Sequence, residues 1–459
     1  MSIKLTSALN FAQQERIRFL DKLKIFSAIP SVSTEPEHKE DITRAAEWVA
    51  DQLRSLGMEN VKIFPTDGHP VVYGESLKAG IDVPTVLIYG HYDVQPAEPL
   101  AKWDSDPFKP EIRGENIYAR GISDMKGQVA AALNAVEAIT QTSQLPVNVK
   151  FLIEGEEEVG SPNLGKFILD NKEMLACDFA LNADTGMIAP DMPTITYALR
   201  GLAYFEVRVY GPKQDLHSGI FGGTIHNPGQ ALAELIAGMH DKNNRITLPG
   251  FYDKVKPLSD DERTELARLN KDADWYLKNT GAPALWGEPE YTPDERVGGR
   301  PTLEVNGLYS GYIGEGGKTV LPAYAMAKIS CRLVPDQDPK EVHQQLLQYM
   351  TNNAPQSIRW EVDYMVGGVP SVSDRNSPWV QAYFKAAESA WGVRPAYKRE
   401  GGSVPVVTDF QQILGVETVN IGFGLPTDNM HGPNEKLHLP TWYKGIDALI
   451  HFFFNLVKT

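Results

Sequence analysis

The chain has 459 residues, enough for about two or three domains with a sizeable buried core. Apolar residues make up 42% of it and charged residues 22%, which is typical of a globular protein and excludes general disorder. Its formal net charge of −15 would be repelled by nucleic acid and by anionic membrane surfaces. We therefore expect neither of these as a partner.

The N-terminal segment, residues 1–26, carries charges throughout and shows no apolar core of a signal peptide. No apolar run in the sequence approaches the roughly 18 residues that a membrane span needs. The two cysteines, Cys177 and Cys331, lie in apolar strand-like runs and are predicted to be buried thiols of a reducing compartment. These features predict a cytoplasmic protein.

The N-terminal part of the chain predicts helices followed by alternating strands and helices. Two amphipathic helices are expected within the first 60 residues, the second of them over residues 42–56. Apolar strand-like runs then occur at residues 84–90, 147–154 and 178–184, and a helical stretch at 124–139 separates the first two. This alternation predicts an α/β domain with a mostly parallel, doubly wound sheet, in which ligands bind at the carboxyl ends of the strands.

The middle of the chain has a different pattern. Residues 203–211 strictly alternate apolar and polar side chains, as a strand with one solvated face does. The predicted elements that follow are a helix at 227–240, an irregular stretch with one charged helix at 245–316, a strand at 323–334, a helix at 339–350 and a strand at 358–366. This order predicts a two-layer α+β domain, residues 201–376, inserted into a larger domain of residues 1–200 plus 377–459.

Residues that bind metals well follow four predicted strands. His91 ends "LIYGH", a run of glutamates ends "FLIEGEEE", Asp184 ends "FALNAD", and His431 follows the predicted strand at 416–424. Asp124 in "RGISDMKG" stands where a loop enters a helix, whose positive end favours an ionised carboxylate. A lone strand-end histidine is usually structural and an aspartate before a helix is usually a cap. Five such residues at one edge of a sheet instead predict a metal site.

Two histidines and three carboxylates suit Zn²⁺, with Mn²⁺ or Co²⁺ as alternatives. Five side chains are too many for one tetrahedral catalytic ion that keeps an open position. Two ions that share a bridging carboxylate and activate a water between them fit the set better. Two Zn²⁺ per subunit are therefore the expected cofactors.

Seven separated motifs resemble one known family. They are "GHYDVQP", "RGISDMKG", "EGEEEVGS", "NAD", "DLHSG", "EGGSVPV" and "HGPNEK". In this order and spacing they resemble the co-catalytic di-zinc metallopeptidases that include aminoacylase, carboxypeptidase G and the carnosine-type dipeptidases. The resemblance covers nearly the whole chain and is strongest to the cytosolic dipeptidase branch. It implies a zinc-binding α/β domain interrupted by a smaller lid and dimerisation domain.

The resemblance implies a role for each of the five metal ligands. His91 and Asp184 would bind one zinc, Asp124 would bridge, and Glu158 and His431 would bind the other zinc. The family also has a cis peptide after the bridging aspartate, which corresponds here to the bond between Asp124 and Met125.

The acidic run at 154–158 contains three consecutive glutamates, whereas the family pattern is Glu-Glu-x-Gly-Ser. Counting back from Gly160 and Ser161 makes Glu157 the general base and Glu158 the ligand. Glu156 is then an extra residue, either solvated or just outside the ligands, and Glu154 closes the strand. Adjacent glutamates in an extended segment point to opposite sides, which favours this division of roles.

Other roles implied by the resemblance involve residues outside the ligand set. Asp93 would orient the imidazole of His91. His217 would stabilise the oxyanion in the partner subunit's site, which requires a homodimer. Arg332 would grip the substrate's C-terminal carboxylate. The alternatives are a turn histidine for His217 and a structural ion pair for Arg332.

The stretch "EGGSVPV" resembles a loop that presents backbone amides and Ser403 to the substrate carboxylate. Gly401 and Gly402 would permit the close approach that such a contact requires. A plain turn before a helix is the alternative for this segment.

The sequence thus predicts a metallopeptidase that hydrolyses dipeptides or other short peptides. One alternative has the same metal site but a different substrate: an N-acyl-amino-acid deacylase or a carboxypeptidase of the same superfamily. A second rival is a catalytically silent metal-binding protein, which the presence of all five ligands and the base disfavours.

Overall fold

The structure is a computed structural model that describes residues 3–402 and 404–457. The chain forms two compact units: Met1–Tyr197 with Ser373–Lys398 and Val404–Thr459, and Ala198–Val372 with Arg399–Ser403. The predicted boundaries instead lie after residues 200 and 376, and the predicted first unit includes residues 399–403. Within the described ranges, no helix combines the length and the apolar character needed to cross a membrane.

The sheet of the first unit is parallel at its centre. Its central strands, in spatial order, are β6 (Asn148–Glu154), β3 (Thr85–His91), β7 (Phe179–Asn182) and β17 (Glu417–Asn420). All three contacts between these neighbours are parallel. Antiparallel strands flank this centre, with β1 (Glu59–Phe64) and β2 (Val71–Ser76) beyond β6 and β8 (Thr194–Leu199) beyond β17. The short strands β15 (Ser371–Val372) and β16 (Ala396–Glu400) pair with β8.

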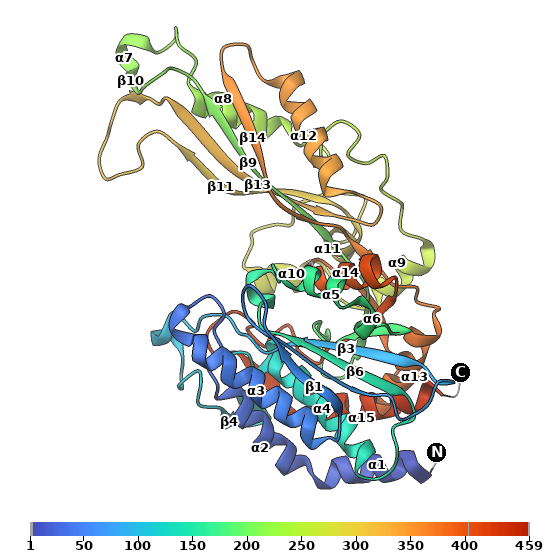
Figure 1. Ribbon diagram of the computed structural model, residues 1–459. Coiled ribbons are helices and arrows are strands. Elements are labelled where there is room, and N and C mark those ends of the chain that lie inside the picture. Colours follow the sequence, from blue (N-terminus) through green and yellow to red (C-terminus); the bar gives the residue numbers. More distant parts are fainter. Residues whose placement is uncertain (1–2, 403, 458–459) are drawn as a thin grey trace. The chain divides into compact units, whose positions relative to one another are not determined.

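Helices cover both faces of the parallel strands, as Figure 1 shows for α3 (Lys39–Ser55) and α4 (Gly127–Thr140) below β3 and β6, and α5 (Leu164–Asp170) above them. Every residue of β6 is buried, as expected for a strand covered on both faces. The remaining helices of this unit are α1 (Ile3–Gln14), α2 (Arg16–Ser27), α6 (Lys172–Leu175), α13 (Pro378–Trp391), α14 (Pro405–Asp409) and α15 (Leu439–Asn455). The first predicted helix is thus two helices, α1 and α2.

The second unit contains a four-stranded antiparallel sheet in the order β11 (Thr302–Ser310), β13 (Tyr324–Leu333), β9 (Gly201–Tyr210) and β14 (Arg359–Gly368). Alternate residues of β9, among them Phe205, Val207 and Val209, are fully buried. They join one hydrophobic core with side chains of α8 (Pro228–Gly238) and α12 (Pro339–Asn353). This is the predicted two-layer α+β arrangement.

The stretch predicted to be irregular with one charged helix contains more helices and strands than predicted. Residues 245–316 contain the helices α9 (Asp260–Ala267), α10 (Ala273–Thr280) and α11 (Pro293–Gly299) as well as strand β11. Strand β11 was missed because most of its side chains are exposed or half-buried, so it shows no regular apolar alternation. A short ladder of β10 (Leu216–His217) with β12 (Val320–Leu321) precedes and supports α7 (Ser218–Phe221).

The fold class was predicted correctly, as an α/β unit with a parallel sheet centre and an inserted α+β unit. Cys331 lies fully buried in β13, as expected. Cys177 differs from the prediction because it lies between α6 and β7 and is only half-buried. Both cysteines of the chain are free thiols.

Candidate metal centre

The carboxyl ends of the parallel strands carry the predicted metal ligands of the first unit. His91 is the last residue of β3 and is completely buried. Asp184 lies two residues beyond the end of β7. Glu154 is the last residue of β6 and leads into the short helical turn Glu157–Val159. Parallel strands end at a common edge, so residues far apart in the sequence meet there.

Asp124 lies in the turn Ile122–Lys126 that leads into α4. The peptide between Asp124 and Met125 is cis, as the family resemblance implied. The two oxygens of the Asp124 carboxylate face two different histidines. Oδ1 lies 3.1 Å from Nε2 of His91, and Oδ2 lies 3.0 Å from Nε2 of His431. This is the arrangement of a carboxylate that can bridge two ions.

The donor atoms form two groups that share Asp124. His91, Asp124 and Asp184 form the first group, and Asp124, Glu158 and His431 form the second, with the ligand atoms of each group within 4.8 Å of one another. In the first, Nε2 of His91 lies 3.9 Å from Oδ1 of Asp184, and in the second, Nε2 of His431 lies 3.2 Å from Oε2 of Glu158. Ligands of a tetrahedral zinc ion lie about 3.3 to 3.6 Å apart, given zinc–ligand bonds of about 2.0–2.2 Å. Both groups therefore fit a divalent cation.

The crowded carboxylates strongly change the acidity of the cluster. Burial alone would lower the pKa of His91, but its hydrogen bonds to Asp124 and Asp93 and the charge of Asp184 raise that pKa well above its usual value. Hydrogen bonds to Asp124 and Glu158 raise the pKa of His431 to about 10. Burial, together with the charge of Asp124, raises the pKa of Asp184 well above its usual value. In the absence of metal, protons on the two histidines partly neutralise the carboxylates, and a bound cation would replace these protons.

The side chain of Glu157 has a different environment from the ligands. Burial raises its pKa to about 7, the positive charge of His91 opposes this shift, and the carboxylates of Asp124 and Glu158 reinforce it. The neighbouring Glu158 belongs to the second ligand group, whereas Glu157 belongs to neither. The two adjacent glutamates therefore occupy different places in the site.

Asp93 makes contacts beyond the predicted one. The backbone carbonyl of Asp93 lies 3.0 Å from Nδ1 of His91, and its carboxylate Oδ1 lies 3.4 Å from the same nitrogen. The Asp93 carboxylate also accepts hydrogen bonds from the backbone N–H groups of Glu157 and Glu158, at 3.2 and 3.1 Å. It therefore holds the glutamate turn in place as well as facing the histidine.

Two other glutamates of the acidic run are structural. Glu156 is buried, so the prediction that it could be solvated is wrong. Its carboxylate accepts hydrogen bonds from the backbone N–H of His69 and the side-chain amide of Asn163. Glu154 accepts hydrogen bonds from the hydroxyl groups of Tyr89 and Ser161, and burial raises its pKa to about 8.

The remaining predicted site residues belong to the second unit. His217 is exposed, and its Nδ1 accepts a hydrogen bond from the backbone N–H of Gly219 at the start of α7. Arg332 on β13 lines a cavity of about 440 Å³ together with Arg200. Open space surrounds the position where a Cβ on Gly402 would lie. Ser403 lies outside the described residues.

Two side chains that contact this centre were not among the predicted site residues. Gln95 donates a hydrogen bond of 2.8 Å from Nε2 to Oε2 of Glu158. Glu435 is buried and accepts a hydrogen bond from the backbone N–H of Asp124 at 3.1 Å. Both lie inside motifs that had been recognised, "GHYDVQP" and "HGPNEK", so membership of these motifs was the available signal.

Comparison with known proteins places this geometry in a family. The model of peptidase family M20/M25/M40 matches residues 87–455. The Cys-Gly metallodipeptidase of Candida albicans is 30% identical over 95% of this chain and 94% of its own length. The human Beta-Ala-His dipeptidase is 31% identical over 96% of this chain and 90% of its own length.

A solved structure agrees with these sequence relatives. The M20 family metallo-carboxypeptidase Sso-CP2 from Sulfolobus solfataricus has a TM-score of 0.84 and 33% identity, covering 96% of this chain and 99% of the other. The family match spans most of the sequence, including all five residues of the two ligand groups. The chain therefore belongs to peptidase family M20/M25/M40, a family of metal-dependent hydrolases.

Proposed function

We propose that the protein hydrolyses dipeptides and other short peptides at a dinuclear metal centre. The observation that carries this proposal is the pair of ligand groups joined by the two oxygens of Asp124, with Glu157 beside them but outside both groups. The named activities of its relatives, Cys-Gly and Beta-Ala-His dipeptidases, support the substrate class.

His91 and Asp184 would hold one cation, Glu158 and His431 would hold the other, and Asp124 would hold both. The nitrogen and oxygen donors favour Zn²⁺, with Mn²⁺ or Co²⁺ as alternatives. When bound, two such cations would lower the pKa of the attacking water and polarise the scissile carbonyl. Asp93 and Gln95 would keep the ligand side chains oriented through the hydrogen bonds described above.

Glu157 is the proposed general base. Its carboxylate would take the proton of the attacking water and deliver it to the nitrogen of the leaving amine. A base works best when its pKa lies near the operating pH, and burial raises the pKa of Glu157 to about 7. The backbone of Glu157 is held by Asp93, which keeps this carboxylate beside the ligands.

The second unit would supply groups that bind the substrate. Arg332 would bind the substrate's C-terminal carboxylate, with Gly402 and Ser403 presenting the backbone of their loop to it. Arg332 and Arg200 line one cavity. Burial lowers the pKa of the Arg332 guanidinium, which stays charged as arginine side chains do. We further propose a homodimer in which His217 stabilises the oxyanion in the partner subunit's site, a role that the exposure of His217 allows.

A substrate panel tests the reaction. Purified protein loaded with Zn²⁺, Mn²⁺ or Co²⁺ would be incubated with dipeptides, longer peptides and N-acyl amino acids, and the products identified by mass spectrometry. Cleavage of dipeptides supports the proposal. Cleavage of acylated amino acids alone would show a deacylase, and release of C-terminal residues from long peptides would show a carboxypeptidase, which the similarity to Sso-CP2 favours as the second candidate.

Subunit mixing tests the role of His217. Glu157→Gln and His217→Ala variants, each inactive alone, would be mixed under conditions that exchange subunits. If His217 acts across the dimer, a mixed dimer contains one site with both residues intact, and activity returns. If activity does not return although mixed dimers form, His217 does not act in this way.

The free thiols Cys177 and Cys331 support a cytoplasmic location, which fractionation of cells would test.

A further inference from the structure

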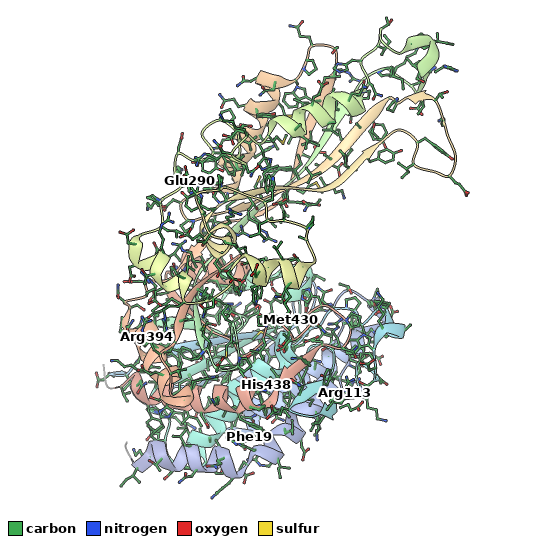
Figure 2. The ribbon with its side chains drawn as sticks, turned by 180° about the vertical axis from the view of Figure 1, so that it is seen from behind. Phe19, Arg113, Glu290, Arg394, Met430 and His438 are labelled. Atoms are coloured by element: carbon green, nitrogen blue, oxygen red, sulfur yellow. The ribbon has the colours of Figure 1, made fainter. Side chains whose placement is uncertain are left out.

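Glu435 is a buried carboxylate that the proposed reaction does not use. Only 1% of it is exposed, and along the chain it stands between Met430 and His438, the two residues of this segment that Figure 2 labels. Strand β18 (Lys436–His438) begins directly after it and pairs with β5 (Asn116–Tyr118). The carbonyl of Glu435 continues this ladder by accepting a hydrogen bond of 3.1 Å from the backbone N–H of Ala119. The backbone pairing therefore fixes where the carboxylate lies.

The two oxygens of Glu435 have different sets of donors. Oε2 accepts hydrogen bonds from Nη1 of Arg120 at 2.8 Å and from the backbone N–H of Gly121 at 2.7 Å. Oε1 accepts hydrogen bonds from the backbone N–H groups of Ser123 and Asp124, at 2.9 and 3.1 Å. Oε2 thus forms the buried ion pair with Arg120, whereas Oε1 binds the backbone of the loop that carries the shared ligand Asp124.

The loop that Glu435 holds is not a regular helix. Asp124 and Met125 have non-helical backbone angles inside the turn Ile122–Lys126, so the intrahelical hydrogen bonds of a continuous helix do not position Asp124. The hydrogen bond from the N–H of Asp124 to Glu435 is therefore a direct constraint on the backbone that orients the Asp124 carboxylate. A second hydrogen bond holds the same loop, because Oγ of Ser123 donates to Oδ2 of Asp428 at 3.1 Å.

We propose that Glu435 is a positioning residue that aims the Asp124 carboxylate at both cations and couples it to the segment that carries His431. This inference rests on the proposed dinuclear centre. His431 and Glu435 belong to one short segment, and each contacts Asp124, one at its carboxylate and the other at its backbone N–H. Movement of this segment would therefore change the bridging geometry.

The test uses Glu435→Gln, which keeps the size of the side chain but replaces one acceptor oxygen with an amide donor. Whichever oxygen is replaced, two of the four hydrogen bonds become donor-to-donor contacts. Metal-free wild-type protein and the variant would be titrated with Mn²⁺ against a chromophoric chelator, and exchange coupling between the ions would be followed by electron paramagnetic resonance. We expect the affinity for the pair of ions to fall about 10- to 100-fold and the coupling signal to change, with loss of kcat exceeding any change in KM.

The matched control is Glu288→Gln in the second unit, which breaks a buried ion pair with Arg300 but contacts no proposed ligand. It should lower stability while leaving Mn²⁺ affinity and coupling unchanged. If Glu435→Gln does not fold, Glu435→Asp replaces it, because the shorter carboxylate keeps the charge but cannot reach all four donors. A folded Glu435 variant with wild-type affinity and coupling overturns the inference alone. Wild-type protein that binds no pair of ions overturns both the inference and the proposed function.

Discussion

Nε2 of His431 lies 3.0 Å from Oδ2 of Asp124, although 307 positions separate the two residues in the sequence. The other oxygen of Asp124 lies 3.1 Å from Nε2 of His91. One carboxylate thus connects two histidines that come from different chain segments of the first unit, Met1–Tyr197 and Val404–Thr459. Changes at this junction should alter metal binding, protonation and catalysis together.

Replacing Glu157 with glutamine should remove the base while leaving the ligands in place. We expect kcat on a cleaved dipeptide to fall about 100-fold or more, because an amide cannot accept the proton of the attacking water. The metal content, measured by inductively coupled plasma mass spectrometry, should stay at the wild-type value, since Glu157 belongs to neither ligand group.

The matched control for this substitution is Glu156→Gln, because the carboxylate of Glu156 faces His69 and Asn163 instead of the ligands. It should alter kcat far less than Glu157→Gln does. If the Glu157 variant retained full activity, another group would be the base.

Metal binding should release protons. In the metal-free protein the pKa of His91 is raised well above its usual value and that of His431 is raised to about 10, so both imidazoles hold protons near neutral pH. A cation must displace these protons, and its affinity should therefore decrease as the pH is lowered from about 8 to about 6. Calorimetric titration in buffers of different ionisation enthalpy would count the released protons. A heat of binding that is independent of the buffer would contradict this prediction.

Chelation should abolish hydrolysis and lower the unfolding temperature. Cations bind the native ligand groups and not the unfolded chain, so saturation at about 100 times the dissociation constant adds about 2.7 kcal/mol to the free energy of unfolding for each site. Differential scanning calorimetry with and without chelator measures this change. Restoring Zn²⁺, Mn²⁺ or Co²⁺ one at a time should recover both properties, and the metal that recovers the most activity identifies the preferred ion. Full activity of the chelated, metal-free protein would refute the dinuclear mechanism.

Asp447 on α15 should make stability depend on pH away from the metal centre. Burial raises its pKa to about 6 from the ordinary value of 3.8, and Arg16, whose Nη2 lies 4.0 Å away, only partly opposes the shift. Because the folded state binds the proton more tightly, the free energy of unfolding should decrease as the pH rises from about 4 to about 6. The Asp447→Asn variant lacks this titration. Between about pH 4 and about pH 6 its free energy of unfolding should rise relative to that of the wild type by about 1 kcal/mol, a value reduced because the side chain is partly exposed.

Urea unfolding of metal-free wild type and variant at about pH 4 and about pH 7 would measure this difference. Equal pH dependence of the two proteins would show that Asp447 does not titrate abnormally.

Much of the fold follows from local patterns. The apolar runs that became β3, β6 and β7 were recognised because strands covered on both faces consist almost entirely of apolar residues. Strand β9 was recognised because one face is buried and the other half-exposed. Strand β11 was missed because its side chains are mostly exposed, so its place depends on pairing with β13 and not on its own pattern.

Local patterns were enough to predict which residue types end the parallel strands, and hence the ligands His91 and Asp184, because side-chain alternation and strand direction are local properties. The roles of the buried carboxylates Glu156 and Glu435 depend instead on how the chain folds. Their partners include backbone N–H groups of distant segments, at His69 and at Asp124. Every non-proline residue carries such a group, so no residue pattern in the sequence reveals the contact before the chain has folded.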